Sequence, residues 1–127
     1  MHNILVCDDD RDIVAALKIY LSGGEYRVFE AYNGSEAVEA VRKNDIHLVL
    51  MDIMMPVMDG LTATKTIRSL ERQDAKTIPI IAMTANAFRE DAEKCMEAGM
   101  NAHLAKPLDD KTIKQTICEE LRSSRDR

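Results

Sequence analysis

Short apolar runs recur along the chain and alternate with segments in which apolar residues are spaced three or four apart. The runs lie at residues 4–7, 27–30, 47–51, 78–83 and 102–105, and each is short enough for a β-strand. The first, third and fourth runs are almost continuously apolar, which is expected of parallel strands that are covered on both faces. The second run is weaker, and we expect it at the edge of the sheet.

The segments between the runs predict five amphipathic helices, and glycine-containing turns such as Asn33-Gly34 and Asp59-Gly60 separate several of the elements. The alternation predicts an α/β fold of the (βα)5 type, a doubly wound, five-stranded parallel sheet formed by one domain. The helical spacing is carried by Ile13, Leu17 and Leu21; Ala37, Val38 and Val41; Ala63, Ile67 and Leu70; Phe88, Ala92 and Met96; and Ile113, Ile117 and Leu121.

Polar side chains follow four of the five predicted strands. Asp8–Asp10 come after the first strand, Asp52 after the third, Thr84 after the fourth and Lys106 after the fifth. In open parallel sheets, functional groups gather at the carboxyl ends of the strands. We therefore expect these residues to lie together, although they are far apart in the sequence.

The acidic run after the first strand combines two roles. Asp10 precedes the helical segment that contains Ile13, so capping of that helix explains it better than chemistry does. Asp8 and Asp9 repel each other and gain nothing by capping the same helix, so we interpret them as cation ligands. Carboxylate oxygens suit Mg²⁺, and the run lacks the spacing of a calcium-binding EF-hand loop.

Asp52 follows a buried apolar strand and would add a third carboxylate to the same place. A capping role fits poorly, because a helix would hardly begin through Pro56, four residues later. A carboxylate can act as a nucleophile and form an aspartyl phosphate, with a divalent cation offsetting the charge. Thr84 and Lys106 are weak signals singly, since strand-end threonines often cap helices and most lysines are solvated. Their joint placement supports phosphoryl chemistry.

Composition and charge narrow the possible functions. The chain has 127 residues, 46% of them hydrophobic, which suits one compact domain. Its net charge of −5 provides no electrostatic footprint for nucleic acid or an anionic membrane. Cys7, Cys95 and Cys118 are odd in number and lack C-x-x-C spacing, so we interpret them as small hydrophobes in a reducing cytoplasm. We expect neither a signal peptide nor a membrane span.

Four segments together resemble the response-regulator receiver domains. They are I-L-V-C-D-D-D, L-V-L-M-D-I-M-M-P-V-M-D-G, A-M-T-A-N-A and A-K-P. The resemblance implies a flavodoxin-like sheet with strand order 2-1-3-4-5, a receiver domain over residues 1–121 and a charged tail at 122–127. It also implies a phosphoacceptor of a two-component phosphorelay, a signalling domain that catalyses only its own phosphorylation and slow dephosphorylation.

The same resemblance assigns roles around a Mg²⁺ ion. Asp52 would be the phosphoacceptor and a metal ligand, and Asp9 the principal further side-chain ligand. Asp8 would act mostly through water, and Met54 would supply only its backbone carbonyl.

The resemblance to receiver domains also implies that Lys106, Thr84 and the backbone amide of Ala85 would contact the phosphoryl group. It further implies a cis peptide bond between Lys106 and Pro107. At the switch position, where many members have Tyr or Phe, this chain has His103. His103 either fills space at the tip of an edge strand or rotates into the gap left by Thr84 and adds pH dependence.

The phosphodonor would be a histidine kinase or a histidine phosphotransfer protein, and an output domain or effector would lie outside this chain. We expect the first helix to help dock the donor through Ile13, Val14 and Leu17, unless these residues face the sheet. The first half of the sequence is similar to receivers of DNA-binding regulators, and the second half to receivers attached to sensor kinases. The parent architecture stays open.

Two other functions share parts of this pattern. A flavodoxin-like nucleotide or flavin carrier has the same alternation of elements, but a phosphate-cradling loop needs glycine and free amides rather than three carboxylates. A small phosphohydrolase with an aspartate nucleophile would have a D-x-D pair, and Met54 occupies the second position of that pair. Both fit the sequence less well than a receiver.

Overall fold

The computed structural model describes residues 2–23, 25–85 and 89–124. Its strands and helices alternate as the sequence predicts, which confirms the (βα)5 fold, although Phe88 lies outside the described residues. The strands are β1 (His2–Cys7), β2 (Tyr26–Ala31), β3 (Leu48–Asp52), β4 (Ile80–Thr84) and β5 (Ala102–Ala105). The helices are α1 (Arg11–Tyr20), α2 (Gly34–Lys43), α3 (Gly60–Arg68), α4 (Arg89–Ala98) and α5 (Asp110–Ser124).

The five strands form one parallel sheet in the order β2-β1-β3-β4-β5, which confirms both the expected order and the edge position of β2. The register aligns the carboxyl ends of the central strands. Cys7 pairs with Met51, and Asp52 pairs with Met83. The residues that follow β1 and end β3 and β4 therefore meet at one edge of the sheet.

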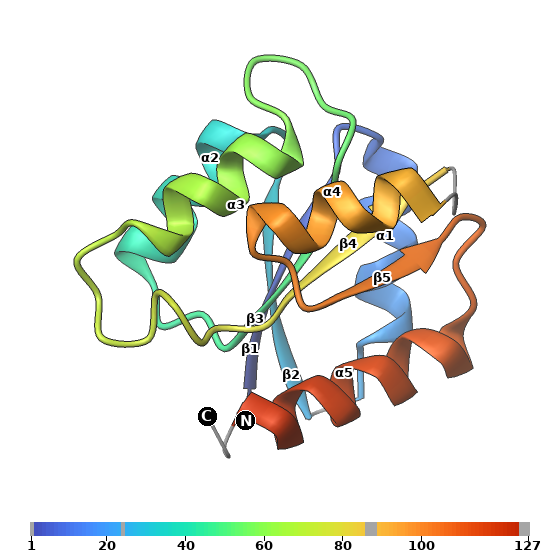
Figure 1. Cartoon of the computed structure of the whole chain (residues 1–127). Coiled ribbons are helices and arrows are strands. Elements are labelled where there is room, and N and C mark those ends of the chain that lie inside the picture. Colours follow the sequence, from blue (N-terminus) through green and yellow to red (C-terminus); the bar gives the residue numbers. More distant parts are fainter. Residues whose placement is uncertain (1, 24, 86–88, 125–127) are drawn as a thin grey trace.

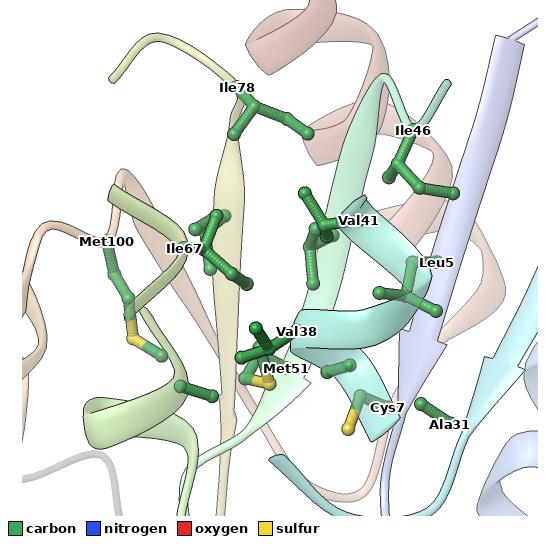
Figure 2. Packing of buried hydrophobic residues seen from close by; sticks show 14 of the residues in the cluster. Leu5, Cys7, Ala31, Val38, Val41, Ile46, Met51, Ile67, Ile78 and Met100 are labelled. Atoms are coloured by element: carbon green, nitrogen blue, oxygen red, sulfur yellow. The ribbon is translucent and has the colours of Figure 1, made fainter. Parts of the chain in front are cut away.

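Helices cover both faces of the sheet, with α2, α3 and α4 on one side and α1 and α5 on the other (Figure 1). Successive residues of β1 alternate between the two cores: Leu5 packs with the α2 and α3 side, and Ile4 with the α1 and α5 side. Figure 2 shows Val38, Val41 and Ile67 facing the sheet in the first of these cores. Burial on both faces explains why the central runs are continuously apolar.

Side-chain caps begin several helices at the carboxyl edge of the sheet. Asp10 accepts the Asp12 amide at 2.9 Å, which confirms its capping role. Asn33 caps α2 and Asp59 caps α3 in the same way, through the amides three residues later. These caps fix where the loops at this edge end.

The prediction that α1 docks the phosphodonor through three apolar residues is wrong for two of them. Val14 is 1% exposed and Leu17 is fully buried, and both belong to the core beneath α1, while Ile13 is half-buried against it. Helical periodicity identifies an apolar stripe but does not say whether the sheet or a partner covers it. Here the sheet covers it.

Burial of Val14 changes the expected effect of Val14→Asp. The substitution places a carboxylate in the apolar core, so it should destabilise the fold by about 3 kcal/mol rather than remove donor docking alone. Urea denaturation of the variant, beside the exposed control Ile19→Asp, tests this. A wild-type midpoint for Val14→Asp would contradict the packing of α1.

Candidate functional site

Three carboxylates converge at the carboxyl ends of β1 and β3. Asp8 is fully buried, Asp52 is 4% exposed, and Asp9 beside them is exposed. One carboxylate oxygen from each lies within 4.8 Å of the others. The cluster that the sequence places at this edge is thus present in the folded chain.

Lys106 reaches into this cluster from the end of β5. Its Nζ lies 2.9 Å from Oδ2 of Asp8 and 3.5 Å from Oδ1 of Asp52. The Lys106 amide donates to the carbonyl of Thr84 at 2.8 Å, and the peptide bond from Lys106 to Pro107 is cis, as predicted. The lysine therefore bridges two buried carboxylates and is tied to the end of β4.

Backbone amides support both buried carboxylates. Asp8 Oδ1 accepts the Asp10 amide at 3.0 Å, and Asp52 Oδ1 accepts the Met54 amide at 3.3 Å. Burial, followed by the negative charge of Asp8, raises the pKa of Asp52 from 3.8 to about 6, although Lys106 and the Met54 amide oppose this shift. The carboxylates are therefore held in place but not electrostatically balanced.

For Lys106, burial is outweighed by the neighbouring charges in setting the pKa, whereas for Asp52 burial dominates. Burial lowers the pKa of Lys106, but its hydrogen bond to Asp8 and the charges of Asp52 and Asp8 outweigh burial and leave that pKa raised. Lys106 is therefore a fixed positive charge at neutral pH. It offsets part of the negative charge of the site.

The other predicted site residues lie around this centre. Thr84 ends β4 and is 4% exposed, and Ala85 after it is exposed. Met54 lies in the loop after β3 with its side chain 77% exposed. His103 is exposed on β5 and lines a groove of about 800 Å³ between α4 and α5. Rotation of its side chain into the gap beside Thr84 stays a prediction.

Sequence reasoning missed the groups that hold the loop carrying Met54. The Gly34 amide donates to the Met58 carbonyl at 2.9 Å, and the Cys7 thiol lies 3.5 Å from the Met55 sulfur. The Asn33-Gly34 pair gave a signal, but only as a turn before a helix. Cys7 and Cys95 are buried as expected, whereas Cys118 is exposed.

The residues present fit a small divalent cation. Three carboxylates offer hard oxygen ligands within reach of one another, which is the donor chemistry that Mg²⁺ prefers. Two of these carboxylates are buried, and Lys106 contacts both. A bound dication would therefore offset charge that the folded chain leaves unbalanced.

Comparison with known proteins assigns this chain and its fold to a family. The profile of the response regulator receiver domain matches residues 4–118. The chain belongs to this family. Receiver domains are the phosphoacceptor modules of two-component signalling rather than conventional enzymes, and membership decides against a flavin carrier and a phosphohydrolase.

Three similar proteins illustrate the relationship. Sensor histidine kinase RcsC of Escherichia coli K12 is 40% identical over 126 residues, covering 97% of this chain and 13% of the kinase. A CheY-like receiver domain from Methanospirillum hungatei superposes with a TM-score of 0.89 at 25% identity, covering 99% of this chain and 98% of that one. The receiver domain of sensor histidine kinase PA1611 from Pseudomonas aeruginosa has a TM-score of 0.85 at 33% identity, with coverage of 94% and 97%.

Two of these comparisons bear on the metal and on the parent protein. The PA1611 receiver structure contains a magnesium ion coordinated in its active site cleft. This receiver spans only 13% to 15% of the first histidine kinases that it resembles. Among the described residues, no helix has the length and apolar character needed to cross a membrane.

The convergence of carboxylates predicts that this site reduces stability when no metal is bound. Asp52→Asn should raise the free energy of unfolding in chelator by on the order of 1 kcal/mol or more, because it removes a buried charge beside Asp8. Asp9→Asn should give a smaller rise, since Asp9 is exposed. Excess Mg²⁺ should stabilise the wild type and do little for Asp9→Asn.

Thermal melts with Mg²⁺ and with chelator measure these differences, and Glu71→Gln, at an exposed position, controls for net charge. If Asp52→Asn melts below the wild type in chelator, then Lys106 and the amide hydrogen bonds outweigh the repulsion. The site would then not be strained.

The raised pKa of Asp52 also predicts a pH dependence. Because the pKa is higher in the folded than in the unfolded chain, the folded state binds this proton more tightly, and Asp52 opposes folding increasingly from about pH 4 to about pH 6. In chelator, the stability gap between Asp52→Asn and the wild type should be small at the acidic end, widen across this range and then level off. A gap that stays constant or narrows as pH rises would contradict the shift.

Proposed function

We propose that Asp52 is the phosphoacceptor and takes its phosphoryl group from a phosphohistidine. The supporting observation is a buried carboxylate at the end of β3 that lies beside two further carboxylates and 3.5 Å from a lysine ammonium. The N–P bond of the donor breaks, an O–P bond forms at a carboxylate oxygen of Asp52, and the electron pair of the broken bond returns to the imidazole.

The metal site of this proposal consists of Asp9, Asp52 and the backbone carbonyl of Met54, with Asp8 acting mostly through water. The clustered oxygens of the three aspartates support it. When bound, Mg²⁺ supplies positive charge that offsets the nucleophile and the incoming phosphoryl oxygens. Asp8 also orients Lys106 through the contact at 2.9 Å.

Lys106, Thr84 and the Ala85 amide contact the phosphoryl oxygens in this proposal. Lys106 already lies between Asp8 and Asp52, and the hydrogen bond from its amide to Thr84 keeps the two residues together. His103 is the proposed switch residue, since it lies on β5 beside the groove between α4 and α5.

The proposed partner is a histidine kinase or a histidine phosphotransfer protein in the cytoplasm, and the signal passes to an effector or output domain outside this chain. The three free cysteines support a reducing compartment, and the net charge of −5 supports a function without direct nucleic-acid or membrane binding. In this proposal the receiver domain occupies residues 1–121, and residues 122–127 form a charged tail.

Acetyl phosphate with Mg²⁺ should add one phosphoryl group to the wild-type chain, and intact-mass measurement detects it. Asp52→Asn should abolish the added mass. Asp9→Ala should weaken Mg²⁺ binding and slow transfer by about 10-fold or more, because it removes a direct ligand. Lys106→Ala should keep most of the Mg²⁺ affinity while it impairs transfer and the response to phosphorylation.

The control is Asp59→Asn, which removes a nearby exposed carboxylate while an asparagine can still cap α3. It should be phosphorylated like the wild type. Full labelling of Asp52→Asn would place the acceptor on another residue and overturn the proposal.

A further inference from the structure

The loop between β3 and α3 begins and ends at the same point of the backbone. The Gly60 amide donates to the Ile53 carbonyl at 3.2 Å, and a Cβ added to Gly60 would lie 2.2 Å from the Asp52 carbonyl oxygen. The two ends of the loop formed by residues 53–59 therefore lie against each other, beside the carboxylate cluster. Met54, the proposed backbone ligand, lies in this loop.

The loop contains a strained turn. Val57 has a φ of 67°, and the amide of Met58 donates to the carbonyl of Pro56 at 2.7 Å across it, which is the hydrogen bond of a γ-turn. A γ-turn with positive φ is rare, and a β-branched residue tolerates positive φ poorly. Val57 is also 86% exposed, so burial of its side chain does not stabilise the turn. Contacts elsewhere must hold it.

Two such contacts come from the turn that starts α2 and from the last residue of β1. The Gly34 amide donates to the Met58 carbonyl at 2.9 Å, and a Cβ at Gly34 would lie 2.4 Å from that carbonyl oxygen. The Cys7 thiol donates to the Asn33 carbonyl at 3.3 Å and lies 3.5 Å from the Met55 sulfur. One contact holds the loop before the strained residue and the other holds it immediately after.

We infer that Gly34 is a positioning residue for the phosphoacceptor site: it clamps the strained β3–α3 loop so that the Met54 carbonyl and the Asp52 carboxylate are presented together. Only glycine allows α2 to approach the Met58 carbonyl this closely. The start of helix α2 thus helps to fix the loop that carries Met54 through the backbone contact between Gly34 and Met58. The inference rests on the proposed function for the role of Met54 as a metal ligand.

Gly34→Ala tests the clamp, because the added methyl group cannot coexist with the present contact to Met58. In metal-free protein, the amides of Met54 and Met58 should exchange with solvent faster than in the wild type. Calorimetric titration with MgCl2 should show an affinity weakened about tenfold, the usual effect of losing a group that orients a ligand.

Gly23→Ala is the matched control. Gly23 has a φ of 124° and open space around it, so alanine strains the backbone there without a clash, at the opposite end of β2 from Asn33. This variant should lose overall stability and keep the Mg²⁺ affinity and the loop exchange rates of the wild type. Equal changes in both variants would show that Gly34 acts only on overall stability, which would overturn the inference.

Two further variants keep the test decisive if Gly34→Ala folds poorly. Cys7→Ala removes the second contact without adding atoms and should speed exchange of the same amides. Val57→Asn, which suits positive φ better, should partly restore Mg²⁺ affinity when combined with Gly34→Ala. No restoration, or no loop effect of Cys7→Ala, would contradict a clamp on a strained turn. If the wild type bound no Mg²⁺, the proposed function would fail, while amide exchange would still test the clamp.

Discussion

The site depends on two buried carboxylates, Asp8 and Asp52, held at one edge of the sheet with a lysine between them. Burying like charges together is unfavourable, so the surrounding structure must force the arrangement. Parallel pairing does so, because the register that aligns β1, β3 and β4 also aligns the residues at their ends. The two apolar cores on either face of the sheet supply the stability that this arrangement costs.

This electrostatic imbalance connects structure with function. A site that is complete without ligand would have little affinity for a dication or a phosphoryl group, whereas an excess of carboxylate attracts Mg²⁺. Lys106 cannot remove the excess, since it offsets only part of the charge of the two carboxylates that it contacts. The same features that make the metal-free fold less stable therefore prepare it for phosphoryl transfer.

The sequence predicted most of this arrangement because its elements are local. Continuous apolar runs identify strands buried on both faces, and the residues just after them must lie at the carboxyl edge, which located Asp8, Asp52, Thr84 and Lys106. The capping role of Asp10 was likewise readable from the helical segment after it.

The features that escaped prediction depend on tertiary contacts. Helical spacing identified Ile13 and Leu17 as one apolar stripe, but the burial of Val14 against the sheet had to be seen in the fold. The bond from Gly34 to Met58 joins two loops that the sequence keeps apart, and the positive φ of Val57 contradicts the usual preference of valine. Cys118 is exposed on α5, where its thiol lies 3.6 Å from the Tyr26 hydroxyl, a position that residue type alone does not indicate.

We conclude that burial and mutual repulsion act on Asp52 in the metal-free protein. The most direct test is a titration of its side-chain carboxyl group by ¹³C NMR in the presence of chelator, with Asp52→Asn used to assign the resonance. We predict a pKa of about 6 for Asp52 in this titration. A pKa at or below 3.8, the ordinary value for aspartate, would show that Lys106 and the Met54 amide already balance the site, and would contradict the claim.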